Sequence, residues 1–219
     1  MKRFRDRSDA GRQLGARLVS YAGRSDVLVL ALPRGGVPVA AEVARALSAP
    51  LDVFLVRKLG MPGHEEFAIG AIASGGICVV NEETLRDYGV SREQVNAVVL
   101  AEQHELERRE RQYRGDRAFP DVAGKTAILI DDGLATGSTM RAAVAALRLE
   151  RPSRIVVAVP TAPSETCTEL AAIVDEMVCL MTPEPFYAVG LWYEDFSQTS
   201  DDEVRTLLDH AQRVANPEG

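Results

Sequence analysis

Apolar residues in this sequence gather in short runs that alternate with segments of helical spacing. Five apolar runs predict strands that are buried on both faces, at 27–32, 51–56, 127–130, 155–159 and 177–180. Four segments predict helices, at 9–22, 38–47, 140–149 and 164–173, with Ser164 as the N-cap of the last. Strands that alternate with helices predict an α/β fold in which a parallel sheet carries helices on both faces.

One long segment, 57–125, interrupts this alternation. Within it, 67–74 and 77–81 flank Gly75-Gly76 and predict a β-hairpin. A helix is predicted over 91–113, where Ser91 and Gln94 form a capping box. We therefore expect one domain over 1–219, with a core at 23–60 and 121–182, an inserted flap and helix at 61–120, a small C-terminal hood at 183–205 and a frayed end at 212–219.

Composition narrows the classes of function. The 219 residues suffice for one sizeable domain, and 46% hydrophobic with 26% charged residues is typical of a globular protein. A net charge of −7 and a pI near 5.1 disfavour non-specific binding to nucleic acid. No signal peptide or membrane-length apolar run is evident, and the cysteines Cys78, Cys167 and Cys179 form no CxxC pair. These features predict a cytoplasmic protein with no nucleic-acid or membrane partner.

The segment 126–140 carries the clearest functional pattern. A buried strand ends at two adjacent acids, Asp131 and Asp132, and the small residues 135–139 then lead into an Ala- and Leu-rich helix. The N–H groups and the positive dipole end of such a helix bind anionic phosphate. The neighbouring carboxylates suit ribose hydroxyls or a hydrated Mg²⁺. The alternative is that the acids only end a strand and cap a helix.

This pattern resembles the signature of the type I phosphoribosyltransferases, which bind phosphoribosyl pyrophosphate (PRPP). Every position from 128 to 139 matches, and the loop is most similar to that of the adenine-type enzymes. The resemblance implies an Mg²⁺-dependent transferase of nucleotide metabolism that moves a 5-phosphoribosyl group from PRPP to a nitrogenous base and releases pyrophosphate. It assigns the ribose and the metal to Asp131 and Asp132, and the 5-phosphate to Ala135, Thr136, Gly137, Ser138 and Thr139.

The segment 32–37 follows the first strand and contains Gly35 and Gly36. These glycines free the backbone for positive φ and expose N–H groups, which suits a diphosphate oxygen. The resemblance implies that Arg34, Gly35 and Gly36 bind the pyrophosphate, with a cis peptide bond between Arg34 and Gly35. The alternative is an ordinary turn between a strand and a helix.

Arg57 and Lys58 follow the second predicted strand. They resemble the basic turn of the adenine-type enzymes, which implies that they bind the leaving pyrophosphate and assist catalysis. The alternative is a solvated pair of cations. The next segment, 60–66, is rich in Gly and Pro and predicts a mobile lid that excludes water. His64 within it is a candidate general acid or base, although a single His in a polar loop is more often inert.

The segment 183–196 concentrates aromatic residues in a chain that is 5% aromatic. It resembles the hood of the purine phosphoribosyltransferases, in which a ring stacks on the base and an acid lies near the metal. The register assigns these roles to Tyr187 and Glu194, whereas a shift of one residue gives Phe186 and Asp195. Trp192 is a second candidate for base binding. The alternative is that the rings only pack the hood onto the sheet.

One position departs from part of the family. The hypoxanthine-guanine enzymes carry an Asp at the position of Ala135, where it is thought to assist proton transfer at the base. Adenine- and orotate-type enzymes lack this acid too, so the acceptor base stays open. The main alternative function is a non-catalytic sensor of PRPP or nucleotides. A third reading, a hydrolase, is disfavoured because this sequence lacks the Gly-x-Ser-x-Gly elbow of that class. The family's habit implies a homodimer.

Overall fold

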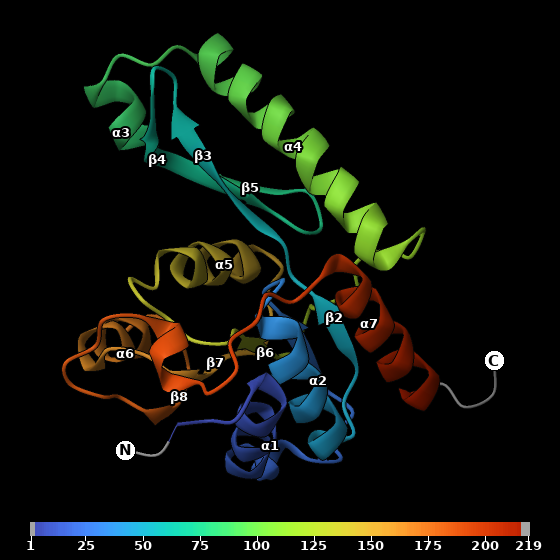
Figure 1. The fold of residues 1–219 in the computed structure, drawn as a ribbon. Helices are drawn as coiled ribbons and strands as arrows, with labels where there is room; N and C mark the ends of the chain where they lie inside the picture. The colour runs from blue at the N-terminus through green and yellow to red at the C-terminus, as the bar shows by residue number, and fades with distance from the viewer. Residues whose placement is uncertain (1–2, 216–219) are drawn as a thin grey trace.

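The computed structural model describes residues 3–215 and contains two sheets (Figure 1). The central sheet is entirely parallel, and its strand order is β2-β1-β6-β7-β8. Its strands are β1 (Val27–Ala31), β2 (Leu51–Val53), β6 (Thr126–Ile130), β7 (Arg154–Thr161) and β8 (Glu176–Met181). All five predicted strands are present, with β2 shorter than expected.

Helices cover both faces of this sheet, as predicted. One face carries α1 (Arg7–Arg17), α2 (Gly36–Leu47) and α7 (Asp201–Ala215), and the other carries α5 (Ser138–Leu149) and α6 (Ser164–Ala171). Successive side chains of a strand point to opposite faces. Val29 accordingly packs with α1 and α2, whereas Leu28 and Leu30 pack with α5. The fully apolar runs are explained by a sheet buried on both sides.

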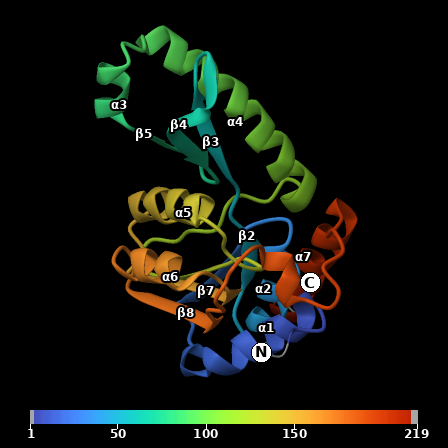
Figure 2. The same cartoon turned by 60° about the vertical axis from the view of Figure 1, so that its left-hand side comes forward.

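The second sheet forms an arm that rises from the central sheet beyond α5 (Figures 1 and 2). It is antiparallel, with the order β3-β4-β5. The arm comprises β3 (Val56–Met61), β4 (His64–Ala73), β5 (Ile77–Val80), α3 (Glu82–Asp87) and α4 (Arg92–Arg114). The hairpin and the Ser91–Gln94 capping box are confirmed. The predicted lid at 60–66 is instead the end of β3, a tight turn and the start of β4.

Three predictions at the ends of elements were wrong. The first helix ends at Arg17 and is followed by a 3-10 turn, η1 (Val19–Tyr21), rather than continuing to 22. Pro163, not Ser164, is the N-cap of α6 and makes no side-chain cap. The chain is helical in α7 as far as Ala215 rather than frayed from 212, and residues 216–219 lie outside the described part. Within the described residues, no helix is both long and apolar enough to cross a membrane.

Candidate functional site

The acid pair lies at the carboxyl end of β6, directly beside the loop that follows β1. Ala31 pairs with Ile130, so the two central strands end at the same level. A Cβ added to Gly35 would lie 2.0 Å from Oδ2 of Asp132. One added to Gly36 would lie 2.7 Å from the carbonyl oxygen of Ile130. The structure therefore brings the predicted pyrophosphate loop against the predicted ribose-binding acids, and only glycine permits this approach.

The conformation of this loop differs from the prediction in two respects. Gly35 has φ −60° and ψ −31°, the ordinary right-handed region, so its freedom to adopt positive φ is not used. The cis peptide bond joins Pro33 to Arg34, one bond before the predicted position at Arg34–Gly35. The glycines are required because a side chain would collide with the acid pair.

The turn from β6 to α5 forms the other half of the site. Gly137 has a left-handed φ of +69°, and a Cβ there would lie 2.7 Å from Cγ2 of Thr166. Helix α5 then starts at Ser138 without a side-chain cap, so N–H groups of its first turn face the turn. Thr136 and Thr139 are exposed beside them. The segment 135–139 thus has the local structure of an anion-binding helix start.

Arg141 braces this turn, and sequence reasoning missed it. Its Nη2 donates to the carbonyl oxygen of Thr136 at 2.6 Å, and its Nη1 donates to Glu169 of α6 at 2.9 Å. Thr166 of α6 also donates to the carbonyl oxygen of Ala135 at 2.9 Å. These contacts fix the turn through its carbonyl oxygens, and among its N–H groups that of Ser138 donates weakly to the hydroxyl of Thr136 at 3.4 Å.

Burial makes ionisation of the acid pair unfavourable. Burial first, and the charge of Asp132 second, raise the pKa of Asp131 well above its ordinary value. Burial also raises the pKa of Asp132, while the nearby Arg7 opposes this. Two adjacent carboxylates in such a place are stable in their ionised forms only with a cation close by.

Arg7 of α1 supplies one cation, and nothing in the sequence pattern indicated it. Its Nε donates to Oδ2 of Asp132 at 2.8 Å, although the two residues are 125 positions apart. Tyr193 of the hood donates its hydroxyl to the carbonyl oxygen of Asp132 at 2.5 Å. Burial, and then the charge of Asp132, raise the pKa of this phenol. Both contacts are long-range, so periodicity and local motifs carry no trace of them.

The hood covers the start of the turn, but its predicted site residues do not all converge there. Val189 of η2 (Val189–Trp192) packs on Gly133, where a Cβ would lie 2.5 Å from its Cγ1. The side chain of Tyr187 is exposed, with 79% of its surface accessible. Trp192 stacks with Phe186 at 6.5 Å between ring centroids. Its buried Nε1 has no hydrogen-bond partner within the described residues.

The predicted acid Glu194 lies on the side of the hood that faces the N-terminal segment. Its N–H donates to the carbonyl oxygen of Phe4 at 2.8 Å, and it lines a cavity of about 630 Å³ with Arg3, Arg5 and Met181. Among the side chains that the structure describes, no three of His, Cys, Asp or Glu are grouped so that they could hold a metal. The structure therefore does not join Glu194 to the acid pair in a metal-binding cluster.

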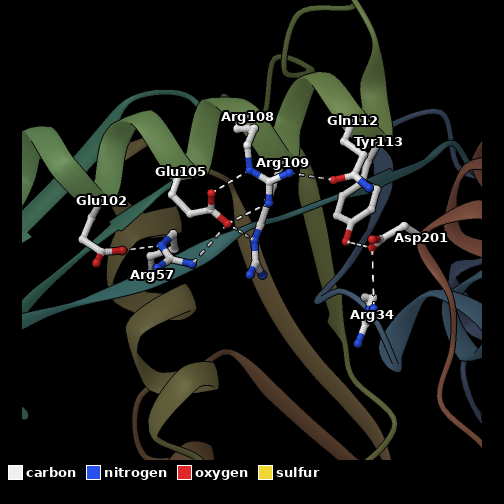
Figure 3. A network of polar contacts seen from close by, with 9 residues as sticks. All are labelled: Arg34, Arg57, Glu102, Glu105, Arg108, Arg109, Gln112, Tyr113 and Asp201. Atoms are coloured by element: carbon white, nitrogen blue, oxygen red, sulfur yellow. Dashed lines mark hydrogen bonds and ion pairs between the residues drawn. The ribbon is translucent and has the colours of Figure 1, made fainter.

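The predicted basic turn is part of β3, and its arginine is already paired (Figure 3). Arg57 donates to Glu102 of α4, and its Nη1 lies 4.0 Å from Glu105. Lys58 is exposed in the same strand. The prediction that these two residues follow the end of β2 was wrong. The apolar run at 51–56 extends beyond β2 and into the first residue of β3, so residues 57 and 58 lie within β3 and not on the turn that ends β2.

Arg34 belongs to the same polar network (Figure 3). Its Nη1 lies 3.8 Å from Asp201 at the start of α7, and Tyr113 of α4 donates its hydroxyl to Asp201 at 2.5 Å. Burial, and then its bond to Asp201, raise the pKa of Tyr113 to about 12. Beside Arg34 lies a polar cavity of about 380 Å³, which Gln112 and Thr199 also line. His64 is exposed at the start of β4, in the arm.

Comparison with known proteins shows the family. A model of the phosphoribosyl transferase domain matches residues 4–184, and the chain belongs to this family. Rv0571c from Mycobacterium tuberculosis, named provisionally as a phosphoribosyl transferase, is 47% identical over 213 residues. The match covers 97% of this chain and 48% of that protein, so the chain spans about half the length of the curated relatives it matches.

Solved structures agree on the fold. The crystal structure of TT1426 from Thermus thermophilus is 42% identical with a TM-score of 0.84, and the match covers 94% of this chain and 97% of that one. AQ2163 from Aquifex aeolicus is 12% identical with a TM-score of 0.50, covering 84% and 78% of the two chains. At that identity the second likeness concerns the fold alone.

Proposed function

We propose that this chain transfers a 5-phosphoribosyl group from PRPP to a nitrogenous base and releases pyrophosphate. One observation carries the proposal. A pair of carboxylates and an uncapped helix start are held on the two ends of one turn, 131–139, at the carboxyl edge of the sheet. Ligands of open α/β folds bind at this edge. A phosphorylated sugar has the two chemical features, a diol and a phosphate, that such a turn can hold together.

The residues of the turn would position the donor. N–H groups of 135–139 and the hydroxyls of Thr136 and Thr139 would bind the 5-phosphate. Asp131 and Asp132 would accept hydrogen bonds from the ribose hydroxyls. Arg34 and the N–H groups of the adjacent loop would bind the pyrophosphate end. Charge stabilisation and positioning, rather than a covalent intermediate, would then account for catalysis.

The donor set at the acid pair fits Mg²⁺ in part. Two carboxylates are hard oxygen ligands, and Asp131 forms no ion pair within the described residues. Mg²⁺ commonly binds through one or two carboxylates while phosphate oxygens and waters complete its shell. When bound, it would neutralise charge that develops on the leaving pyrophosphate. The described residues offer no third acid, so the remaining ligands would have to come from the donor and water.

A sensor that binds PRPP or a nucleotide without turnover is the second candidate. The observation that favours it is the pairing of Arg57 with Glu102 and Glu105. Of the cations predicted to bind pyrophosphate, this leaves Arg34, which belongs to the loop beside the acid pair. A weakly stabilised leaving group is compatible with binding but slows transfer.

Two measurements on the whole chain separate these functions. Calorimetry with PRPP and Mg²⁺ measures donor binding, and pyrophosphate release with a panel of purine and pyrimidine bases measures transfer. Release with one base supports the transferase and identifies its acceptor. Tight PRPP binding without release on any base supports the sensor.

The site itself is tested by Asp131→Asn combined with Asp132→Asn. Loss of the carboxylates should weaken Mg²⁺-dependent PRPP binding by about a hundredfold or more, because charge-assisted hydrogen bonds and metal ligands are both removed. The double variant should keep the far-UV and near-UV circular dichroism of the folded protein. Unchanged PRPP affinity in this variant would show that the donor does not bind at the acid pair.

A further inference from the structure

Arg7 is fixed at the acid pair by three contacts, one with Asp132 and two with the adjacent hood residues Phe196 and Ser197. Its Nε donates to Oδ2 of Asp132 at 2.8 Å, and its Nη1 donates to the carbonyl oxygen of Ser197 at 2.6 Å. Its guanidinium carbon lies 3.9 Å from the centre of the Phe196 ring. Only 12% of its side chain is exposed, so this is a built contact rather than a surface pair.

The segment that carries Arg7 is bound to the hood by main-chain hydrogen bonds. Phe4 donates its N–H to Trp192 at 2.9 Å and accepts one from Glu194 at 2.8 Å, and Asp195 donates to Arg5 at 2.9 Å. Tyr193 of the same hood segment donates to the carbonyl oxygen of Asp132. The N-terminal segment and the hood therefore form one layer, which holds Asp132 by its carboxylate and by its backbone.

The carboxylate of Asp132 has little freedom between its neighbours. On one side the carboxylate lies against Gly35, in the space that a Cβ of that residue would need. On the other side its Oδ2 accepts a hydrogen bond from Arg7. Its side chain is 14% exposed. A cation or a hydroxyl that approaches Oδ2 therefore meets a guanidinium already in place. The positive charge repels a free divalent cation and satisfies the oxygen that would bind it.

We propose that Arg7 masks the acid pair, so that the pair does not take up a divalent cation by itself. A cation enters only with a ligand whose own anionic oxygens offset the repulsion and displace Arg7 from Asp132. This inference rests on the proposed function, because it concerns how the donor and its metal reach the site. It makes Arg7 a positioning residue that couples metal entry to donor binding.

The test uses Mn²⁺ alone, followed by electron paramagnetic resonance of the full chain without any sugar phosphate. Arg7→Gln removes the charge and should raise the affinity for Mn²⁺ about tenfold over the unmodified protein. Arg7→Lys keeps a point charge but loses the planar fork, and it should raise the affinity only about threefold. Arg7→Gln combined with Asp132→Asn should abolish the gain.

Two control variants isolate the cause. Arg12→Gln removes an equal charge from the same helix, where Arg12 is 41% exposed and pairs with Glu42 and Asp9, and it should leave Mn²⁺ affinity unchanged. Arg5→Gln removes a charge just before this helix, where the side chain of Arg5 is 66% exposed and lies 3.8 Å from Asp9, and it should also leave Mn²⁺ affinity unchanged. A rise in both controls equal to that of Arg7→Gln would overturn the proposal, because the effect would then be general.

Equal Mn²⁺ affinity of the Arg7 variants and the unmodified protein would overturn it as well. If Arg7→Gln does not fold, Arg7→Lys decides the question, with no rise counting against the proposal. PRPP calorimetry on the unmodified protein keeps the two hypotheses apart. Absence of PRPP binding would refute the proposed function while the Mn²⁺ series still reports on Arg7.

Discussion

At the scale of single residues, the fold buries the two carboxyl groups of the acid pair where their ionised forms are unfavourable. Burial raises the pKa of Asp131, and its carboxylate accepts the N–H of Asp132 at 2.8 Å. The folded protein therefore retains a proton on Asp131 at pH values where the unfolded chain has lost it. Folding stability falls as the pH rises from the unfolded pKa, about 3.9, towards the higher folded pKa, and it then levels off.

Asp131→Asn should remove this penalty. The amide oxygen can still accept the N–H of Asp132, so we expect the variant to be more stable than the unmodified protein at pH 7, by about 1.4 kcal/mol for each unit by which folding raises the pKa of Asp131. The gain should vanish near pH 3.5, where both states of the unmodified protein carry the proton. Thermal unfolding of both proteins between pH 3.5 and 8 measures this difference. A constant difference across that range would contradict the electrostatic cause.

Individual residues also show where sequence reasoning stops. The positions of Gly35 and Gly36 after a strand place them at the site, but the sequence does not show why glycine is needed there. The colliding groups are Asp132 for Gly35, and Ile130 and Asp131 for Gly36, all at the end of a strand far along the chain. Arg7 and Tyr193 act on the same aspartate through contacts of similarly long range. Local periodicity records which residues share an element, and it contains no information on which elements meet.

At the scale of elements, patterns with a purely local cause were predictive. The apolar runs of β1 and β6 are fully buried, and the capping box of α4 forms as the spacing of Ser91 and Gln94 indicates. β3 was missed because its sequence, Val-Arg-Lys-Leu-Gly-Met, places cations where a buried strand would carry apolar residues. Those cations are accommodated because β3 belongs to a second sheet, in which Arg57 pairs with glutamates of the neighbouring α4 and Lys58 is exposed.

The pairing of β3 with α4 leads to a prediction about pyrophosphate. Glu102→Gln with Glu105→Gln should release Arg57 and raise the affinity for pyrophosphate, measured by calorimetry, by about three- to tenfold, because two negative charges are removed. Glu107→Gln on the same helix is the matched control, since Glu107 contacts Gln103 rather than Arg57. Equal affinities in all three proteins would show that Arg57 lies too far from the ligand to contribute.

At the scale of the whole molecule, one of the contacts that join the arm to the core lies at the predicted pyrophosphate loop, while Arg114 of α4 joins them elsewhere by bonding to Asp52 and Val53 of β2. Tyr113 ends the side-chain network of α4, Asp201 begins α7, and Arg34 belongs to the loop after β1 (Figure 3). This connection depends on a half-exposed ion pair of 3.8 Å, which contributes at most about 1 kcal/mol. A ligand that binds Arg34 therefore needs little free energy to break it.

Pyrophosphate should accordingly change the exchange of amide hydrogens far from the loop. When Arg34 turns to the ligand, we expect residues 34 and 35 to exchange more slowly, because the ligand covers their N–H groups, whereas those of Gly36 and Val37 already donate to backbone carbonyl oxygens. The first turn of α7 and the last turn of α4 should exchange roughly two- to fivefold faster, because Asp201 loses a partner. Asp201→Asn should show the faster exchange before any ligand is added. Slower exchange at residues 34 and 35 with no change in α4 or α7 would mean that the loop binds its ligand without altering this connection to the arm.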